Sequence, residues 1–150
     1  MKFYIIDGNN LIGKINSLWK LQKVDGQQSR EKLAFMLDRY FDGSKVKVSL
    51  HFDGYPKDTI RTSNLKIIYS GKQIADSLIK EEIDNAKNPK LITVVSSDFS
   101  VYEYAKVSSC RRIKSEDFAK QLTEKKKGKT EDDIIKSIDN DEMKKLFGIE

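Results

Sequence analysis

The sequence predicts a three-layer α/β fold in which a mostly parallel sheet of about five strands is flanked by helices. Strand-like and helix-like segments alternate along the 150 residues, in the order β-α-α-β-β-α-β-α-β-α. That order is typical of a parallel sheet whose crossover helices cover it. Two strand-like segments, at residues 3–6 and 91–97, are apolar almost throughout, as expected for strands buried on both faces.

The first four elements follow from the spacing of apolar residues and from the residues that interrupt it. Residues 45–52 alternate apolar with polar side chains, so we expect a strand with one less buried face. Before this strand, residues 29–42 have a helical pattern. One face carries Leu33, Met36, Leu37 and Tyr40, and Ser29 is expected to cap the helix. The expected elements are strands at 3–7 and 45–52 and helices at 11–21 and 29–42.

The second half continues the alternation. Gly71 leads into a helix, and Asn88-Pro89 stops it. The expected elements are strands at 65–70, 91–97 and 110–114 and helices at 72–86, 99–107 and 115–127. From residue 130 onward the pattern indicates a final helical segment or a tail.

Composition limits the classes of function. The net charge of +5 permits a polyanionic partner without requiring one. The single cysteine, Cys110, excludes an intrachain disulfide, and we expect it to pack as a small apolar group. No apolar run reaches membrane length, and the stretch before Asp7 is too short for a signal peptide. We therefore expect a cytoplasmic protein with no membrane partner.

Acidic side chains follow several of the predicted strands. Asp7, Asp53 and Asp98 come after the first, second and fourth strands, and Asp76 lies in the first turn of the helix after the third. In a parallel sheet these positions share one edge, beyond the carboxyl ends of the strands, where ligands bind in such folds. Unpaired carboxylates there would repel one another. A divalent cation such as Mg²⁺ or Mn²⁺ resolves the conflict and suits attack of water on a phosphodiester.

Each acid also has a purely structural interpretation. Asp98 can cap the following helix, and Asp76 is favoured at a helix N-terminus whether or not it binds anything. Asp53 with Gly54 can form an ordinary turn. The joint placement of the acids at one edge, rather than any one of them, favours a functional site.

The helix at 72–86 allows a test of which polar side chains face the sheet. At about 100° per residue, Asp76 falls at the edge of the buried stripe and Ser77 nearly opposite it, towards solvent. Glu82 falls near the centre of the stripe, so it is either a further site acid or part of a less buried helix end. The stripe consists of Ala75, Leu78, Ile79, Ile83 and Ala86.

Five segments resemble those of a known family and come in the same order. They are YIIDGNNLI, HFDG, GKQIADSLI, TVVSSDFSVYEYAK and RRIKSEDFAKQL. Over residues 1–123 the chain resembles NYN-domain proteins, and most of all the YacP-like branch of the PIN-like nuclease superfamily. The resemblance implies a Rossmann-like PIN/NYN fold and a metal-dependent endoribonuclease. Because that branch includes ribosome-associated endoribonucleases, it also implies RNA, chiefly mRNA, and the ribosome as partners. Residues 124–150 would form a C-terminal helical extension or tail.

The family's functional positions can be carried over one by one. By position, Asp7, Asp76 and Asp98 match the acidic metal-site residues, and Asn10 matches the polar residue after the first acid. Asp53 matches the acid after the second strand. The sequence departs from the family at Ser77, where the second acid of an Ala-Asp-Asp element is usual. That departure keeps open a catalytically weak or inactive module that binds RNA or the ribosome.

Basic and aromatic side chains near the same edge are candidates for contact with RNA. Lys14, Lys72, Arg111 and Arg112 would contact the phosphate backbone, and the alternative is ordinary solvated surface charge. Tyr55, in the loop after Asp53, would stack on an unpaired base or anchor its own loop.

Other chemistries fit less well. The single histidine, His51, falls on the polar face of its predicted strand, where we expect a surface or half-buried structural role. An aspartyl phosphotransferase would place a second Asp two residues after Asp7, where this chain has Asn9. The serines Ser96 and Ser97 could donate to a phosphate or cap the following helix, and capping is favoured.

Overall fold

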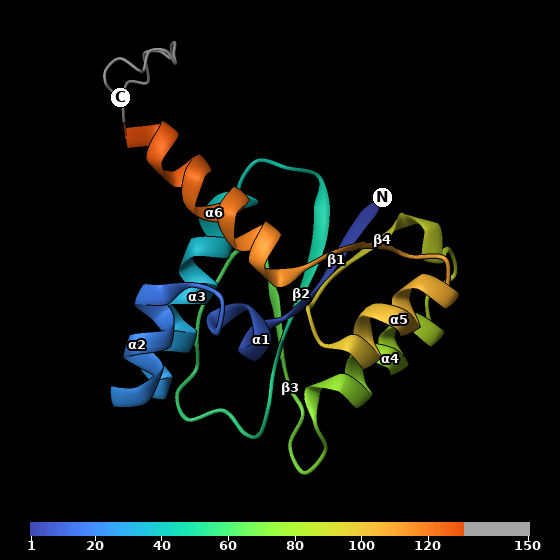
Figure 1. The fold of residues 1–150 in the computed structure, drawn as a ribbon, viewed down its shortest axis with the longest axis horizontal. Coiled ribbons are helices and arrows are strands. Elements are labelled where there is room, and N and C mark those ends of the chain that lie inside the picture. Colours follow the sequence, from blue (N-terminus) through green and yellow to red (C-terminus); the bar gives the residue numbers. More distant parts are fainter. Residues whose placement is uncertain (131–150) are drawn as a thin grey trace. The chain divides into compact units, whose positions relative to one another are not determined.

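A five-stranded, all-parallel sheet forms the centre of residues 1–119, in the order β3-β2-β1-β4-β5 (Figure 1). The computed structural model describes residues 1–130. The strands are β1 (Lys2–Asp7), β2 (Val46–Phe52), β3 (Lys66–Tyr69), β4 (Ile92–Val95) and β5 (Arg111–Ile113). The predicted mostly parallel sheet of five strands is confirmed.

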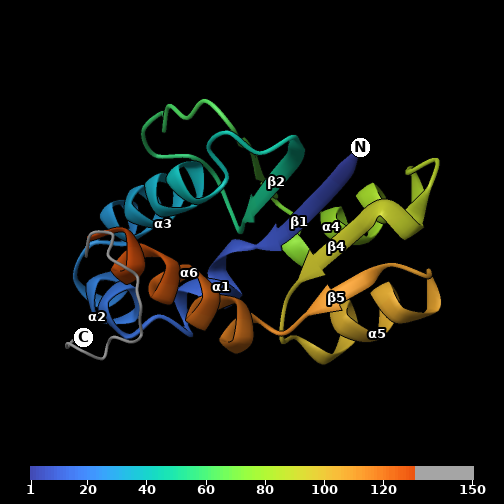
Figure 2. The ribbon, with the colours of Figure 1, turned by 90° about the horizontal axis from the view of Figure 1, so that it is seen from above.

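Helices flank this sheet on both faces. Within residues 1–119, α4 and α5 cover one face and α1 to α3 lie on the other (Figures 1 and 2). The helices are α1 (Gly8–Ile12), α2 (Asn16–Val24), α3 (Gly26–Tyr40), α4 (Ala75–Asp84), α5 (Phe99–Val107) and α6 (Ser115–Thr130), with a 3₁₀ turn at Pro89–Leu91. A second unit begins at Lys120, within α6, and residues 131–150 of the predicted extension lie outside the described residues. No helix in residues 1–130 is long and apolar enough to cross a membrane.

The alternating side chains of β1 build two cores. Ile5 packs towards α4 and α5, in a buried cluster with Ile79, Ile83, Ile92, Val94, Val101 and Ala105. Cys110 packs against this cluster, which confirms the expectation of an apolar role. On the other face, the Tyr4 ring lies 5.0 Å from that of Phe41. Burial on both sides explains why β1 is apolar along its length.

Two local predictions in the first half are wrong. The helix expected at 11–21 is two short helices, α1 and α2, separated at residues 13–15. The helix expected from Ser29 begins earlier, because Asp25 caps α3 by accepting a hydrogen bond from the Gln28 N–H. Ser29 is buried instead, and its hydroxyl donates to the carbonyl of Leu18 at 2.9 Å. That bond joins α3 to α2, a long-range role that a capping pattern does not predict.

The polar face of β2 is buried at Ser49 and His51, contrary to the prediction, although Lys47 on the same face is exposed. Ser49 and His51 are each 1% exposed, so His51 is neither at the surface nor half-buried. Helix α4 covers this face and places Glu82 opposite both side chains. The Ser49 hydroxyl donates to Glu82 Oε2 at 2.7 Å, and His51 Nε2 lies 2.8 Å from Glu82 Oε1. Glu82 therefore lies in the buried stripe as a partner of β2 and not as an acid of the sheet edge.

Replacing Glu82 by alanine is expected to lower the free energy of unfolding by about 2 kcal/mol. The change leaves the buried Ser49 and His51 without their acceptor, and an unsatisfied buried polar group costs roughly 1–3 kcal/mol. Urea denaturation of Glu82→Ala beside Glu81→Ala measures the effect, since Glu81 is exposed on the same helix turn. Equal stability of the two variants would contradict the role assigned to Glu82.

Candidate active site

Asp7 is the last residue of β1 and therefore lies at the carboxyl edge of the sheet. It is only 8% exposed, and its Oδ2 accepts a hydrogen bond from the Ser96 hydroxyl at 2.9 Å. Burial raises the pKa of Asp7 from 3.8 to about 6, although the bonds from Ser96 and from the backbone at Asn10 act in the opposite direction. The charges of Asp53 and Asp98 raise the pKa further. The three acids follow neighbouring strands of the sheet, β2, β1 and β4.

Asp53 is held beside this edge by contacts at both its backbone and its side chain. Its N–H donates to Asn9 Oδ1 at 2.8 Å, which joins the end of β2 to α1. Its Oδ1 accepts a hydrogen bond from the Ala75 N–H at 2.7 Å, at the start of α4. The Asp53 carboxylate is thus partly engaged with a helix N-terminus, a favourable place for negative charge.

Asp98 is the N-cap of α5, and its Oδ1 accepts a hydrogen bond from the Val101 N–H at 3.1 Å. The Ser96 hydroxyl accepts from the Asp98 N–H at 3.1 Å while it donates to Asp7. Ser96 thereby links the first acid to the third. Asp98 itself is exposed, so it combines the predicted cap with a position at the acidic edge.

Asp76 is placed differently from the other three acids. It forms an ion pair with Lys80, one turn later in α4, with 3.0 Å between Oδ1 and Nζ. The same ammonium donates to the Ser100 hydroxyl at 2.6 Å and so connects α4 to the first turn of α5. Ser77 is exposed, as the helical angles predict. Asp76 therefore lies at the edge of the site with its charge already paired.

Asn10 holds two distant segments against α1. Its Oδ1 accepts hydrogen bonds from the Ser97 N–H at 2.8 Å and from the Ser115 hydroxyl at 2.6 Å. The Ser97 hydroxyl in turn accepts from the Ser115 N–H at 2.8 Å and donates to Glu116. Neither Ser96 nor Ser97 is the cap of α5, so the prediction of capping by these serines is wrong. Both instead tie the acid-bearing loops together.

The donors at this edge suit a hard cation more than a soft one. The set consists of carboxylate and amide oxygens, which Mg²⁺ and Mn²⁺ prefer. Within residues 1–130 no group of three or more Asp, Glu, His or Cys side chains is arranged to hold a metal ion. Magnesium, however, usually binds through one or two carboxylates and keeps several waters. Asp7 with Asp53 or Asp98 fits that mode, because a cation would relieve the repulsion that these charges exert on Asp7.

Most of the predicted RNA-contacting side chains are exposed to solvent, although Arg111 begins β5 and so lies at the amino end of that strand. Lys14, Lys72 and Arg111 are exposed, and Tyr55 is 64% exposed with its ring beside Gly71. Arg112 is held by α5. Its guanidinium lies 4.0 Å from the centre of the Tyr102 ring and its Nη1 donates to Glu103 at 3.2 Å.

One cation at the edge is not apparent from the sequence. Arg30, in α3, donates from Nη2 to the Asp53 carbonyl at 2.7 Å. Its guanidinium also lies 5.0 Å from the centre of the Phe52 ring. Arg30 is one of several basic residues on an amphipathic helix, and nothing in the local pattern distinguishes it from the others.

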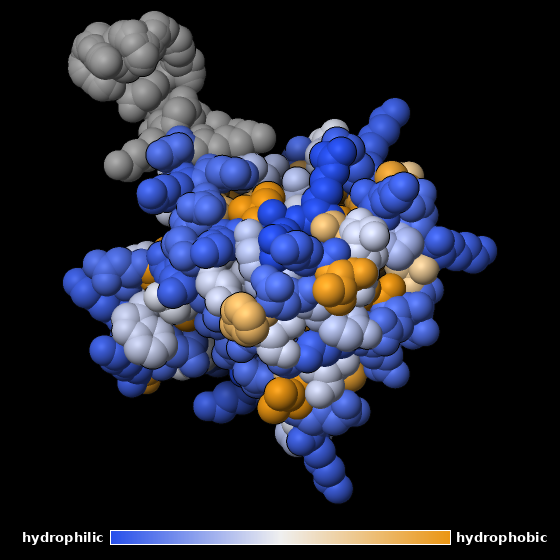
Figure 3. All heavy atoms as spheres, turned by 45° about the vertical axis from the view of Figure 1, so that its right-hand side comes forward, coloured by the Kyte–Doolittle hydropathy of each residue, from blue (hydrophilic) through white to orange (hydrophobic). Residues whose placement is uncertain are grey.

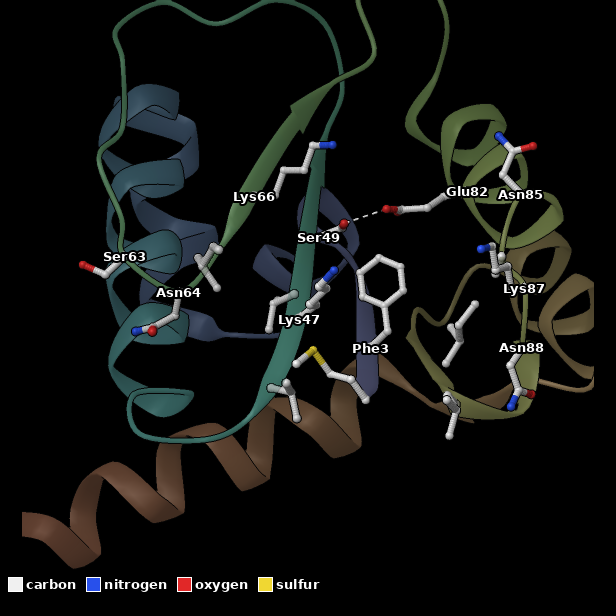
Figure 4. A pocket seen from close by; sticks show the side chains of 17 residues that line it. Phe3, Lys47, Ser49, Ser63, Asn64, Lys66, Glu82, Asn85, Lys87 and Asn88 are labelled. Carbon is white, nitrogen blue, oxygen red and sulfur yellow. Dashed lines mark hydrogen bonds between the residues drawn. The ribbon is translucent and has the colours of Figure 1, made fainter.

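A separate groove opens at the opposite, amino ends of the strands. It has a volume of about 990 Å³ and lies between β2, β3 and α4, with Phe3, Ser49, Lys66 and Glu82 among its lining residues (Figure 4). The Ser49–Glu82 hydrogen bond crosses its inner wall. The acids of the carboxyl edge do not line this groove.

One match to a family model covers enough of the chain to show which family it belongs to. The model of the YacP-like NYN domain matches residues 4–147, which is nearly the whole chain and includes every acid described above. The chain belongs to the YacP-like NYN family. This membership supports a nuclease-type role related to RNA, and NYN and PIN-like nucleases generally use divalent metals.

Two solved structures share the fold of this YacP-like chain. The W164L mutant of Rae1 (YacP) from Bacillus subtilis is 18% identical, with a TM-score of 0.72 over 93% of this chain and 86% of that chain. Another structure of Rae1 (YacP) from Bacillus subtilis is 18% identical, with a TM-score of 0.67 over 87% of this chain and 80% of that chain. Among curated proteins no sequence matches. The likeness confirms the α/β fold of the YacP-like family.

Proposed function

We propose that this YacP-like NYN protein is a metal-dependent endoribonuclease that hydrolyses RNA phosphodiesters at the carboxyl edge of its sheet. The observation that carries the proposal is the convergence of acids from three neighbouring strands. The Ser96 hydroxyl joins Asp7, at the end of β1, to the N–H of Asp98 after β4. The N–H of Asp53 after β2 donates to Asn9, two residues after Asp7. Carboxylates at that edge of an α/β sheet are well placed to receive a ligand.

In this proposal Asp7, Asp53 and Asp98 hold Mg²⁺ or Mn²⁺, and Asp76 contributes at the margin. A bound divalent ion would lower the pKa of a water molecule and offset charge on the phosphate oxygens. The hydrogen bond from Ser96 fixes one oxygen of Asp7. Asn10 keeps the loop that carries Asp98 against α1 through the Ser97 N–H. The chain thus contributes fixed carboxylate positions, which is the main requirement for this type of catalysis.

The substrate is proposed to be RNA, with mRNA on the ribosome the expected form. Lys14, Lys72, Arg111 and Arg112 would contact phosphates, and Tyr55 an unpaired base. Contacts to phosphate give affinity without sequence preference and weaken as salt rises. The exposed positions of Lys14, Lys72 and Arg111 support this part of the proposal.

Asp98→Asn is expected to lower cleavage by more than about 100-fold while leaving the fold intact. Loss of an outer partner of a metal site already costs roughly 10- to 100-fold, and a direct ligand should cost more. Asparagine caps helices as well as aspartate does, so α5 should keep its N-cap. The matched control is Asp25→Asn, because Asp25 caps α3 through the same type of hydrogen bond. Cleavage of mixed single-stranded and structured RNAs with Mg²⁺, Mn²⁺ or EDTA measures the effect.

A second candidate is an RNA- or ribosome-binding module that keeps the fold and does not cleave. Two features favour it: Ser77 stands where the family usually has an acid, and Asp76 is paired with Lys80. RNA binding without cleavage in any metal would support this module. If cleavage then appears only with translating ribosomes, the endoribonuclease is restored as the better description. Metal-independent cleavage that survives in Asp98→Asn would overturn the proposed acidic site.

A further inference from the structure

Three apolar side chains beside the acidic edge are exposed. Phe99 is 78% exposed, Tyr55 is 64% exposed and Ile74 is 59% exposed. Phe99 directly follows Asp98, and Tyr55 comes two residues after Asp53. The surface around α4 and α5 is otherwise largely hydrophilic, with apolar side chains in small separate groups (Figure 3). Large apolar side chains next to charged acids are not explained by packing of the core.

Hydrogen bonds place Ile74 at the same edge as Asp53. Ile74 is the N-cap residue of α4 and directly precedes Ala75, whose N–H donates to Asp53 Oδ1. Tyr55 belongs to the same region, because its ring lies beside Gly71, and the Gly71 N–H donates to the Gly54 carbonyl at 2.8 Å. Tyr55 and Ile74 are therefore carried by segments that are hydrogen-bonded at Asp53 and Gly54.

Phe99 is placed at this edge by a second set of contacts. It is the first residue of α5 and stands between Asp98 and Ser100. The Ser100 hydroxyl accepts from Lys80, which also pairs with Asp76. The ring of Phe99 is thus carried on a helix end that is fixed to α4 while the ring itself remains open to solvent.

We propose that Phe99 is a stacking platform for an unpaired base of the RNA bound at the acidic edge, with Tyr55 and Ile74 as further apolar contacts. This inference rests on the proposed function, because it assumes that the acids receive a phosphodiester. A nucleotide joins a phosphate to a flat apolar base, and this edge offers acids for a metal-bound phosphate directly beside exposed apolar side chains. The exposed Lys72, two residues before Ile74, matches the charge of the RNA backbone. Bases in a duplex are stacked on each other and cannot reach a side-chain ring.

The test compares variants of one helix with two RNA probes. Binding of a fluorescently labelled single-stranded RNA and of the matching RNA duplex is measured by anisotropy in Mg²⁺ and in EDTA, and a gel checks that the probes remain intact during the Mg²⁺ measurement. Phe99→Ala is expected to weaken single-strand binding about tenfold, within the roughly 5- to 150-fold range of base–aromatic stacking, and to leave duplex binding unchanged. Phe99→Tyr, which keeps an aromatic ring, should bind single-stranded RNA as well as the parent protein does. Val107→Ala is the matched control, since Val107 ends the same helix and is 76% exposed.

The outcomes separate this inference from the proposed function. Unchanged single-strand binding in Phe99→Ala, equal weakening for both probes, or no binding of single-stranded RNA by the parent protein with or without Mg²⁺ would overturn the stacking platform. If metal-dependent cleavage persists in these cases, the nuclease assignment stands alone. Selective loss of single-strand binding without cleavage in any metal would support the platform and remove the nuclease assignment. Because Phe99 is exposed, its replacement should leave the thermal midpoint unchanged, and circular dichroism checks this.

Discussion

Asp7→Asn is expected to abolish RNA cleavage and, in metal-free buffer at neutral pH, to stabilise the fold by about 2–3 kcal/mol. Burial raises the pKa of Asp7 from 3.8 to about 6, so folding must confine a carboxylate that prefers to be neutral. Each pKa unit corresponds to about 1.4 kcal/mol. Asparagine removes the charge, and its amide oxygen can still accept the hydrogen bond from Ser96. A gain in stability that accompanies a loss of activity is typical of functional sites.

The sign of this effect follows from the two protonation states. Between about pH 4 and pH 6 the folded chain binds more protons at Asp7 than the unfolded chain, so stability falls as the pH rises through this window. Below about pH 4 the group is protonated in both states, and above about pH 6 the full cost is present. The difference in unfolding free energy between Asp7→Asn and the parent should therefore be small at pH 4 and reach its plateau above pH 6.

Urea denaturation at several pH values between 4 and 8, in EDTA, measures this difference, with Asp25→Asn as the control. Added Mg²⁺ or Mn²⁺ should stabilise the parent more than Asp7→Asn, because a ligand that binds only the folded state adds to its stability. A pH-independent difference would contradict the burial of a charged Asp7. Full metal-dependent cleavage by Asp7→Asn would remove Asp7 from the set of metal ligands.

Gly8→Ala is expected to destabilise the fold by at least about 2 kcal/mol. A Cβ at this position would lie 2.6 Å from the backbone oxygen of His51 and 2.6 Å from the ring of Phe52. Overpacked sites typically cost roughly 1–3 kcal/mol, and a backbone atom cannot rotate away. The glycine lets α1 start directly against β2, which is how Asp7 can end a buried strand at the sheet edge.

Gly13→Ala provides the matched control for this change. Gly13 has a helical backbone with φ of −63°, and a Cβ there would lie 3.4 Å from the Asn10 carbonyl oxygen. Alanine at such a position is expected to be neutral or to stabilise by about 0.4–1 kcal/mol. Thermal and urea denaturation of the two variants should therefore give clearly different results. Similar stabilities would mean that the close approach at Gly8 relaxes without cost.

The placement of the acids shows how far sequence reasoning reaches. Asp7, Asp53 and Asp98 could be assigned to one edge because parallel strands bring their carboxyl ends together. The same reasoning placed Asp76 there too and overlooked Lys80, four residues later in the same helix, which pairs with it. The helical angles correctly predicted that Ser77 faces solvent. They could not predict the role of Glu82, because its partners Ser49 and His51 belong to a different element, β2.

By itself the sequence determined the fold class, the parallel sheet, the buried strand that ends at Asp7 and the edge at which the acids meet. These features depend on periodicity and on residues that start or stop elements, and such signals lie within short windows of sequence. Only the tertiary structure decided how the edge is held. Ser96 reaches Asp7 across 89 positions, and Ser115 reaches Asn10 across 105. Hydrogen bonds between residues so far apart leave no local pattern, because their geometry exists only after the sheet has formed.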